Sequence, residues 1–421
     1  MYFWYRVLAY LFFPFSPIYL YYRKFRKKED LIRYREKLSQ INRPRGNGFL
    51  IWIHVASVGE AMSVLSLIDN CIKEKKINKI LLTSITLSSG KILEKKFRND
   101  EKVIHQFLPL DIPVLTNKFL NHWKPNLSVF IDSEIWPTLI LQTNKKKIPL
   151  ILLNARITRK TFERWNLVKK FAKKIFEKFD LCIASNKESE NFLKILGAKN
   201  IKNYGNLKFS ISKNSSGQKL DSNLLSKIKE RKIWCAVSTH DPEEKICATV
   251  HLEIKKKFDN ILTIIIPRHI DRVKKINEEL LNLNLKVVLS SKFNQVDDKT
   301  DVLLINSYGE TLKFLDIAKY AFVGKSLIQS LAMDGGQNPI EPARLGCKIL
   351  HGPNVSNFTE IYDNFKMLGI AKEIKSSDEL CLSLIELFIE NKPKNSENIK
   401  KIDNYGQNIF NNVILELKKY I

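Results

Sequence analysis

The sequence predicts an α/β protein with two parallel-sheet domains, and three observations lead to this prediction. Apolar runs typical of buried strands alternate with segments whose apolar residues recur at helical spacing. The alternation stops in a polar, aperiodic segment over residues 210–223 and then begins again. With 421 residues, the chain is also too long for one ordinary hydrophobic core. We therefore expect domains over residues 31–209 and 224–421, joined by a linker over 210–223 and facing each other across a cleft.

The N-terminal segment is unusually aromatic. Residues 2–22 are almost all apolar or aromatic, and a basic cluster follows over residues 23–28. Pro14 and Pro17 interrupt the run, which makes a membrane-spanning helix marginal. Aromatic side chains favour the headgroup region of a bilayer, and the basic cluster favours anionic lipid on the cytoplasmic side. We interpret residues 1–30 as a membrane anchor that spans the bilayer or lies in its interface. The alternative is an ordinary buried first helix.

The charge and the cysteines narrow the class of protein. Seventy Lys and Arg against 44 Asp and Glu give a formal net charge of +26, which favours an anionic partner. Anionic lipid and a phosphorylated substrate are the favoured partners, because the sequence carries no recognised nucleic-acid-binding motif. The six cysteines form no CxxC pair and the seven histidines show no HxxxH or HExxH spacing. The sequence therefore indicates neither a disulfide framework nor a catalytic metal.

The first predicted strand leads directly into a carboxylate. Residues 51–55 predict a buried parallel strand, Ser57 and Gly59 predict a turn, and the residues after Glu60 have helical spacing. Ligands of open α/β sheets bind at the carboxyl ends of strands, so Glu60 is a candidate base. The alternative is that Glu60 only interacts favourably with the helix dipole.

Further strands and helices are expected along both domains. In the first domain we expect strands over 79–82, 127–132, 150–154 and 181–184, and helices over 165–179 and 187–196. In the second domain we expect strands over 233–237, 261–266, 286–289, 320–323 and 348–351.

Polar residues follow several of these strands in the first domain. Asp132 and Glu134 follow the strand at 127–132 and only weakly resemble a metal-binding acidic pair. Lys208 precedes the linker, where the cleft is expected. It would neutralise a phosphate or a carboxylate there, or would be an ordinary surface lysine.

The second domain offers phosphate-binding candidates. Arg268 ends a predicted strand and suits a phosphate or carboxylate clamp. Gly335 and Gly336 would let backbone N–H groups approach a phosphate, and Glu341 would accept hydrogen bonds from both ribose hydroxyls. Asp241 and Pro242 suit the N-cap and first position of a helix.

One motif is misleading. Gly324-Lys325-Ser326 resembles the end of a P-loop, but the P-loop requires a glycine where this chain has Lys319.

Taken together, these motifs resemble one family over nearly the whole chain. That family is the 3-deoxy-D-manno-octulosonic acid (Kdo) transferases, which add Kdo to lipid A precursor. The motifs occur in the following order: Ser57-Val58-Gly59-Glu60, Ser133-Glu134-Ile135-Trp136-Pro137, Asn154-Ala155-Arg156, Gly205-Asn206-Leu207-Lys208, Ser238-Thr239-His240, Pro267-Arg268-His269, Gly309-Glu310, Asn338-Pro339-Ile340-Glu341 and Gly352-Pro353 with Asn357-Phe358.

The resemblance implies a GT-B glycosyltransferase with the acceptor site in the first Rossmann-like domain and the CMP-Kdo site in the second. Glu60 matches the family's catalytic base, and Glu134 and Lys208 match its transition-state stabilisers. The positions that match contacts to CMP are Pro267, Arg268, Tyr308, Gly309, Glu310, Asn338, Pro339, Ile340 and Glu341.

The implied activity is inverting, metal-independent and cofactor-independent transfer of Kdo to lipid IVA in lipopolysaccharide biosynthesis, at the cytoplasmic face of the bacterial inner membrane. The alternative is another GT-B enzyme that uses a UDP-sugar and a different membrane lipid. One departure concerns Lys325, because the family usually has Gly-Gly-Ser at 324–326 and a shorter loop before Gly335. The motifs do not distinguish members that add one Kdo from members that add several.

Overall fold

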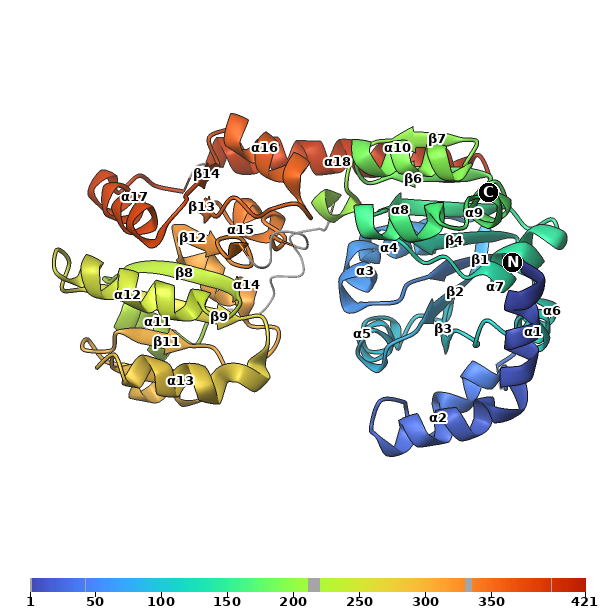
Figure 1. The fold of residues 1–421 in the computed structure, drawn as a ribbon, viewed down its shortest axis with the longest axis horizontal. Coiled ribbons are helices and arrows are strands. Elements are labelled where there is room, and N and C mark those ends of the chain that lie inside the picture. The colour runs from blue at the N-terminus through green and yellow to red at the C-terminus, as the bar shows by residue number, and fades with distance from the viewer. Residues whose placement is uncertain (1, 42, 211–219, 330–334, 395) are drawn as a thin grey trace. The chain divides into compact units, whose positions relative to one another are not determined.

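The computed structural model describes residues 2–41, 43–210, 220–329, 335–394 and 396–421. The chain divides into two units, one formed by Met1–Ser212 with Tyr405–Ile421 and the other by Lys213–Asn404. Within the described residues, each unit is built on one seven-stranded parallel sheet. Helices cover both faces of each sheet (Figure 1). The two predicted Rossmann-like, parallel-sheet domains are thereby confirmed.

The first sheet has the strand order β3-β2-β1-β4-β5-β6-β7, as in dinucleotide-binding folds. Its strands read as near-continuous apolar runs because both faces of a parallel sheet are buried. The strands are β1 (Phe49–His54), β2 (Ile77–Ser84), β3 (Val103–Phe107), β4 (Leu127–Ile131), β5 (Leu150–Ala155), β6 (Leu181–Ala184) and β7 (Ile201–Asn203).

Side-chain alternation divides the core of this unit between the two faces of the sheet. Trp52 and Phe130 point to one face, where their rings pack 5.0 Å apart in a cluster with Phe119, Trp123 and Phe176. The helices are α3 (Val58–Ser63), α4 (Leu65–Lys73), α5 (Leu87–Phe97), α6 (Pro113–Trp123), α7 (Pro137–Lys145), α8 (Arg159–Asn166), α9 (Lys169–Phe176) and α10 (Lys187–Leu196).

The helix predicted over 165–179 is instead two helices, α8 and α9, separated at Val168. Val168 has φ −120° and ψ 39°, which is not helical. The break lets the Trp165 ring contact both Phe171 and Phe176, at 6.1 and 5.5 Å. Residues six apart lie on different faces of a continuous helix, so this packing requires the break.

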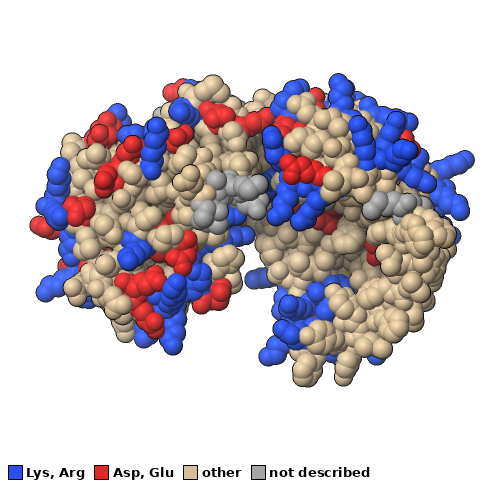
Figure 2. Space-filling model, viewed as in Figure 1, with Lys and Arg blue, Asp and Glu red and all other residues tan. Residues whose placement is uncertain are grey.

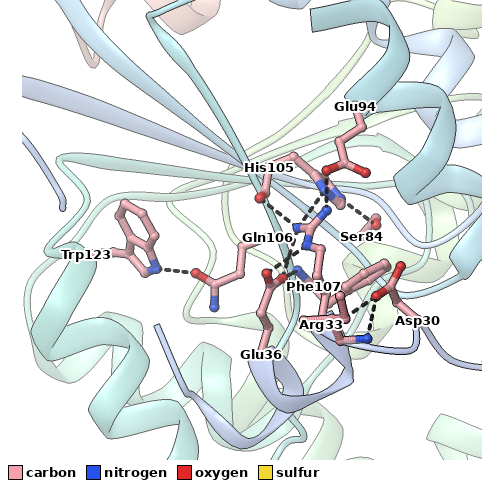
Figure 3. Close-up of polar contacts among 10 residues, drawn as sticks. Asp30, Arg33, Glu36, Ser84, Glu94, His105, Gln106, Phe107 and Trp123 are labelled. Atoms are coloured by element: carbon pink, nitrogen blue, oxygen red, sulfur yellow. Dashed lines mark hydrogen bonds and ion pairs between the residues drawn. The ribbon is translucent and has the colours of Figure 1, made fainter. Parts of the chain in front are cut away.

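The N-terminal segment folds as α1 (Tyr2–Phe12), η1 (Phe13–Phe15), α2 (Ser16–Phe25) and η2 (Arg33–Leu38). The η2 turn covers the edge strand β3 (Figure 3). Arg33 donates to the carbonyl of His105 at 2.9 Å, and Glu36 accepts from the backbone N–H of Phe107 at 2.8 Å. Arg33 also pairs with Glu94 at 2.7 Å. These side chains therefore satisfy backbone groups that an edge strand would otherwise expose.

The second sheet has the order β10-β11-β9-β8-β12-β13-β14. Its strands are β8 (Lys232–Thr239), β9 (Ile261–Pro267), β10 (Val287–Leu289), β11 (Val302–Leu304), β12 (Tyr320–Val323), β13 (Lys348–His351) and β14 (Ala371–Glu373). Its helices are α11 (Ser222–Ile228), α12 (Glu243–Lys255), α13 (Val273–Leu281), α14 (Thr311–Ile317), α15 (Ile340–Arg344), α16 (Thr359–Met367) and α17 (Ser377–Glu390).

The C-terminal helix α18 (Ser396–Lys418) belongs to both units, because residues from Tyr405 onward group with the first one. Tyr405 packs its ring 5.1 Å from Phe209, and Tyr204 donates to Glu416 at 2.9 Å. The sequence alone predicts the whole C-terminus in the second domain, since nothing local to residues 405–421 indicates these distant partners. The predicted linker at 210–223 falls mostly on residues 211–219, which lie outside the described residues.

Candidate functional site

Each sheet has a point where the strand order reverses, between β1 and β4 in the first unit and between β8 and β12 in the second. Ligands of open α/β sheets bind at such points, beyond the carboxyl ends of the strands. Glu60 follows β1 and Glu134 follows β4, so two of the predicted catalytic residues flank the reversal in the first sheet.

Glu60 lies in the first turn of α3, which Ser57 caps. The Glu60 N–H donates to Ser57 Oγ at 3.3 Å, while the Glu60 carboxylate accepts from the Ala56 N–H at 2.7 Å and from Ser57 Oγ at 2.8 Å. This pattern resembles a capping box, except that the Glu60 carboxylate accepts from the N–H of Ala56, the residue before the cap. Glu60 therefore also has the structural role that the alternative gave it, at the start of the helix. Burial nevertheless raises the pKa of Glu60 to about 7, and the negative charges of Glu134 and Asp132 add to the rise. The carboxyl group is therefore also suited to accept a proton near neutral pH.

Glu134 lies against two aromatic rings, the partly buried indole of Trp136 and the buried imidazole of His54. Trp136 Nε1 donates to Glu134 Oε2 at 2.9 Å, and His54 Nε2 lies 3.4 Å from the same oxygen. The ring of His54 is completely buried and contacts Thr83 Oγ1 through Nδ1 at 2.9 Å. The sequence analysis did not single out His54 or its contact with Glu134.

Lys208 is brought to the same site by a short turn, η3 (Leu207–Ser210). The Leu207 N–H donates to Asn154 Oδ1 at 2.8 Å, which fixes the turn to the end of β5. A Cβ on Gly406 of α18 would lie 1.9 Å from the Phe209 carbonyl oxygen, so this helix crosses the turn at the closest approach that glycine allows.

Asp132 joins these groups electrostatically. Burial raises the pKa of Asp132, and the negative charge of Glu134 raises it further. The positive charges of Lys208 and Arg156 act in the opposite direction and lower it. Asp132 therefore interacts electrostatically with Glu60, Glu134 and Lys208, and all three predicted catalytic residues belong to the first unit.

The predicted nucleotide contacts lie in the second unit, after three parallel strands. Pro267 ends β9 and is buried, whereas Arg268 beside it is exposed. Tyr308 is 77% exposed in the loop after β11, next to Gly309 with φ +86° and to Glu310 before α14.

The remaining predicted contacts open helix α15, after β12. Asn338 Oδ1 accepts from the Ile340 N–H at 3.2 Å, Pro339 precedes the helix, and Glu341 lies exposed in its first turn. Because the strands are parallel, all these segments follow the same edge of the sheet.

The loop after β12 binds an anion of its own chain. The backbone N–H groups of Lys325, Ser326 and Leu327 donate to the completely buried carboxylate of Glu243 at 2.7, 3.0 and 3.2 Å. The His240 N–H adds a fourth bond at 3.0 Å. In a P-loop, such N–H groups would bind phosphate. Here they already donate to the Glu243 carboxylate, which agrees with the prediction that this segment is not a P-loop.

Lys325 stands where the family usually has glycine, and the backbone conformation there is one that favours glycine. This residue has φ +56°, a left-handed conformation that glycine adopts without strain. The rest of the longer loop, residues 330–334, lies outside the described residues.

Two further expectations for this edge need adjustment. The paired glycines pack against the 354–355 backbone, because a Cβ on Gly335 would lie 2.4 Å from the Asn354 carbonyl oxygen. Asp241 does not cap α12: the helix begins at Glu243, and the Asp241 carboxylate accepts from Lys275 at 2.9 Å instead.

Among the described residues, no three His, Cys, Asp or Glu side chains are grouped so that they could hold a metal ion. Metal-independent chemistry stays a prediction.

Comparison with known proteins identifies related sequences over the whole chain. A family model described as 3-deoxy-D-manno-octulosonic-acid transferase (kdotransferase) matches residues 29–211. The Kdo transferase of Rickettsia bellii is 34% identical over 404 residues, which cover 96% of this chain and 93% of that relative. A probable mitochondrial Kdo transferase of Arabidopsis thaliana is 30% identical, covering 92% and 88% of the two chains. The Haemophilus influenzae enzyme is 27% identical, covering 90% and 88%.

Solved structures agree with the fold. The UDP-GlcNAc 2-epimerase of Neisseria meningitidis, solved with UDP-GlcNAc, covers 87% of this chain and 100% of its own at a TM-score of 0.55 and 16% identity. Anabaena HepE, solved with UDP, covers 89% and 100% at a TM-score of 0.58 and 12% identity. These likenesses concern the fold alone.

The sequence relatives decide the family: this chain belongs to the 3-deoxy-D-manno-octulosonic acid transferases, which are glycosyltransferases.

Proposed function

We propose that this protein transfers Kdo from CMP-Kdo to a sugar hydroxyl of the lipid A precursor lipid IVA, with inversion at the anomeric carbon. The observation that carries the proposal is the Glu60 carboxyl, whose pKa is raised to about 7 at the point where the first sheet reverses its strand order. The family membership established above supports the same reaction.

Glu60 acts as the general base. Its carboxylate takes the proton from the acceptor hydroxyl as that oxygen attacks the anomeric carbon of Kdo and the bond to the CMP phosphate breaks. A Cβ on the neighbouring Gly59 would meet no atom within 4 Å, so the turn before Glu60 borders open space. Such base catalysis contributes roughly two to four orders of magnitude in rate.

Glu134 and Lys208 stabilise the charges that develop in the transition state. The sugar becomes oxocarbenium-like and positive, which suits the Glu134 carboxylate held by Trp136. The leaving phosphate gains negative charge, which suits the ammonium group of Lys208. Asp132 interacts electrostatically with both of these groups and with Arg156.

The CMP moiety binds in the second unit. The exposed guanidinium of Arg268 clamps the phosphate, and the exposed carboxylate of Glu341 accepts hydrogen bonds from the ribose hydroxyls. Backbone and side-chain contacts from Pro267, the segment Tyr308-Gly309-Glu310 and the segment Asn338-Pro339-Ile340 complete the site. Because the leaving group carries a single phosphate, we propose that transfer needs neither a bridging metal ion nor another cofactor.

The reaction takes place at the cytoplasmic face of the bacterial inner membrane, on which the N-terminal helices lie. No helix within the described residues is long and apolar enough to cross a membrane. An apolar stripe nevertheless runs along α1, η1 and α2, with residues alternately four and three apart in the sequence. Their side chains are 55–83% exposed. The stripe consists of Trp4, Leu8, Leu11, Phe15, Ile18, Tyr22 and Phe25. In Figure 2 this part of the molecule shows a broad surface with few charged groups. Such a surface, next to the basic cluster at 23–28, suits an anionic bilayer.

A transfer assay tests the proposal. It combines purified protein, lipid IVA and CMP-Kdo generated in situ, and the products are read by mass. A gain of one or more Kdo units supports the proposal and gives the number transferred. No gain, together with thermal protection by UDP but not by CMP, would point to a UDP-sugar enzyme instead.

A further inference from the structure

A second pocket, of about 580 Å³, lies between helices α1 and α9 of the first unit, and none of the catalytic candidates lines it. Phe3, Val7 and Tyr10 of α1 and Phe171 of α9 form its apolar part. The remaining lining residues, Arg6, Lys170 and Lys174, are all cations, and none of the described residues that line the pocket is acidic. Its chemistry is therefore amphipathic, with hydrocarbon walls and a positive rim.

The walls of the pocket are held in place by contacts outside it. Tyr5 of α1 donates from its hydroxyl to Asp111 at 2.7 Å, and its ring lies 6.3 Å from that of Phe171. Asp111 in turn accepts the N–H groups of Thr138 and Leu139 at 2.9 and 2.8 Å, at the start of α7. Helix α1 is thus attached to the sheet-bearing body, so the pocket is formed before any ligand arrives.

The cations favour an anionic occupant. Lys170 and Lys174 are four residues apart on α9, and like charges at this spacing destabilise a helix. Arg6 adds a third positive charge from α1, and its planar group suits a phosphate. An anion bound among the three would relieve their mutual repulsion.

The neighbouring surface indicates what the anion is attached to. On α1, the exposed side chains of Trp4, Leu8 and Leu11 lie on the same helix as the pocket's apolar wall, at 67%, 65% and 63% exposure. Acyl chains would bury these apolar side chains, whereas a free phosphate or a nucleotide would not. Positive charge next to exposed apolar and aromatic side chains is the combination that recognises a lipid headgroup.

We propose that this pocket is a specific site for the phosphate headgroup of an anionic membrane phospholipid, with the acyl chains along the apolar surface of α1. The proposal rests on the membrane location given above and goes beyond it, because a site of this kind is saturable and selective for the headgroup. It is independent of the Glu60 cluster, and the protein would bind such a lipid as a ligand and not as a substrate.

The experiment compares the full chain with two double variants of helix α9. Lys170→Gln with Lys174→Gln removes both lysines of the pocket. Lys169→Gln with Lys173→Gln removes the same charge at the same spacing, from two exposed lysines of α9 that do not line the pocket. Binding is measured by co-sedimentation with phosphatidylcholine vesicles that contain phosphatidylglycerol, and folding is checked by thermal unfolding.

The pocket variant is expected to lose about 10- to 30-fold in affinity, and the control variant clearly less. Equal losses in the two variants would overturn the proposal, because they would indicate a diffuse electrostatic surface. If the pocket variant unfolds early, Arg6→Gln against Lys24→Gln repeats the comparison without touching α9.

Monomeric short-chain lipids separate the specific site from general membrane attraction. Dihexanoyl phosphatidylglycerol below its micellar concentration is expected to change the fluorescence of the protein saturably, and dihexanoyl phosphatidylcholine is not. Equal binding of inorganic phosphate would overturn the lipid assignment. Transfer to lipid IVA in detergent is expected to be unchanged in the pocket variant, so failure of the lipid site and failure of the proposed transfer activity give different results.

Discussion

Two glutamates hold corresponding places in the two units and have different roles. Glu60 and Glu243 each lie in the first turn of the helix that follows the central strand, β1 or β8, beside the reversal of strand order. Burial raises the pKa of both. Glu60 accepts one backbone N–H and one hydroxyl, whereas Glu243 accepts four backbone N–H groups and is completely buried. The number of acceptor sites taken by the backbone, more than the place in the fold, thus distinguishes Glu60, which we propose as the base, from the structural carboxylate of Glu243.

The largest effect is expected from Glu60→Gln. The amide cannot accept the proton of the acceptor hydroxyl, so single-turnover transfer should slow by roughly two to four orders of magnitude. Protection of the protein by CMP against thermal unfolding should be unchanged, because CMP is proposed to bind in the other unit. A variant that loses CMP protection would contradict this assignment of Glu60.

The corresponding change in the second unit should affect stability first. Glu243→Ala leaves four backbone N–H groups without their acceptor and is expected to lower the free energy of unfolding by about 3–5 kcal/mol in urea titrations. Asp241→Ala is the control, since it breaks only the partly exposed pairs with Lys275 and Arg272 and should cost less than about 1 kcal/mol. Similar losses in the two variants would mean that Glu243 does not hold the loop after β12.

The pH dependence of stability sharpens the same comparison. The folded state keeps a proton on Glu60 up to a pH of about 7, whereas an ordinary glutamate releases it near 4.5. The contribution of Glu60 to stability is therefore fully present below pH 4.5 and is lost as the pH rises to about 7, by up to roughly 3 kcal/mol. The free energy of unfolding, measured by urea titration, should therefore rise in Glu60→Gln relative to the wild type between pH 5 and pH 8. A difference that does not change with pH would argue against the raised pKa.

The smallest effect concerns His54. His54→Leu removes the ring nitrogen that lies 3.4 Å from Glu134, so the charge of Glu134 should act more strongly on Glu60. The acidic limb of the rate profile is expected to move upward by less than about one pH unit. His54→Gln, which retains an N–H donor, should restore most of the shift. An unchanged limb in both variants would leave His54 as a packing residue only.

Local apolar pattern accounts for the parts of the fold that were predictable. The strands at 181–184, 320–323 and 348–351 have the predicted bounds, because each is a short buried run flanked by polar residues. The strands β3, β7, β11 and β14 were not predicted. Strands β7, β11 and β14 have only three residues each, and β3 includes the polar residues His105 and Gln106, so none of the four is a long apolar run.

Those parts of the site were predictable in which the reactive side chain comes directly after a recognisable strand. Glu60 and Glu134 each follow a strand, as the sequence indicates; the two strands are neighbours in the sheet, and the two carboxyl groups interact electrostatically. Glu243 and His54 were missed because their roles depend on partners 82 and 80 residues away in the chain, Lys325 and Glu134. No local spacing carries that information.

The return of α18 has a consequence for the order in which the protein can be completed. Residues 405–421 leave the ribosome after the whole second unit, yet they pack on the Gly205–Phe209 segment that carries Lys208. During translation, roughly 200 further residues must therefore be synthesised before α18 can pack on the turn that holds Lys208. A premature stop after residue 404 would leave the described strands and the nucleotide-binding candidates in place, and its damage would fall on the turn that carries Lys208.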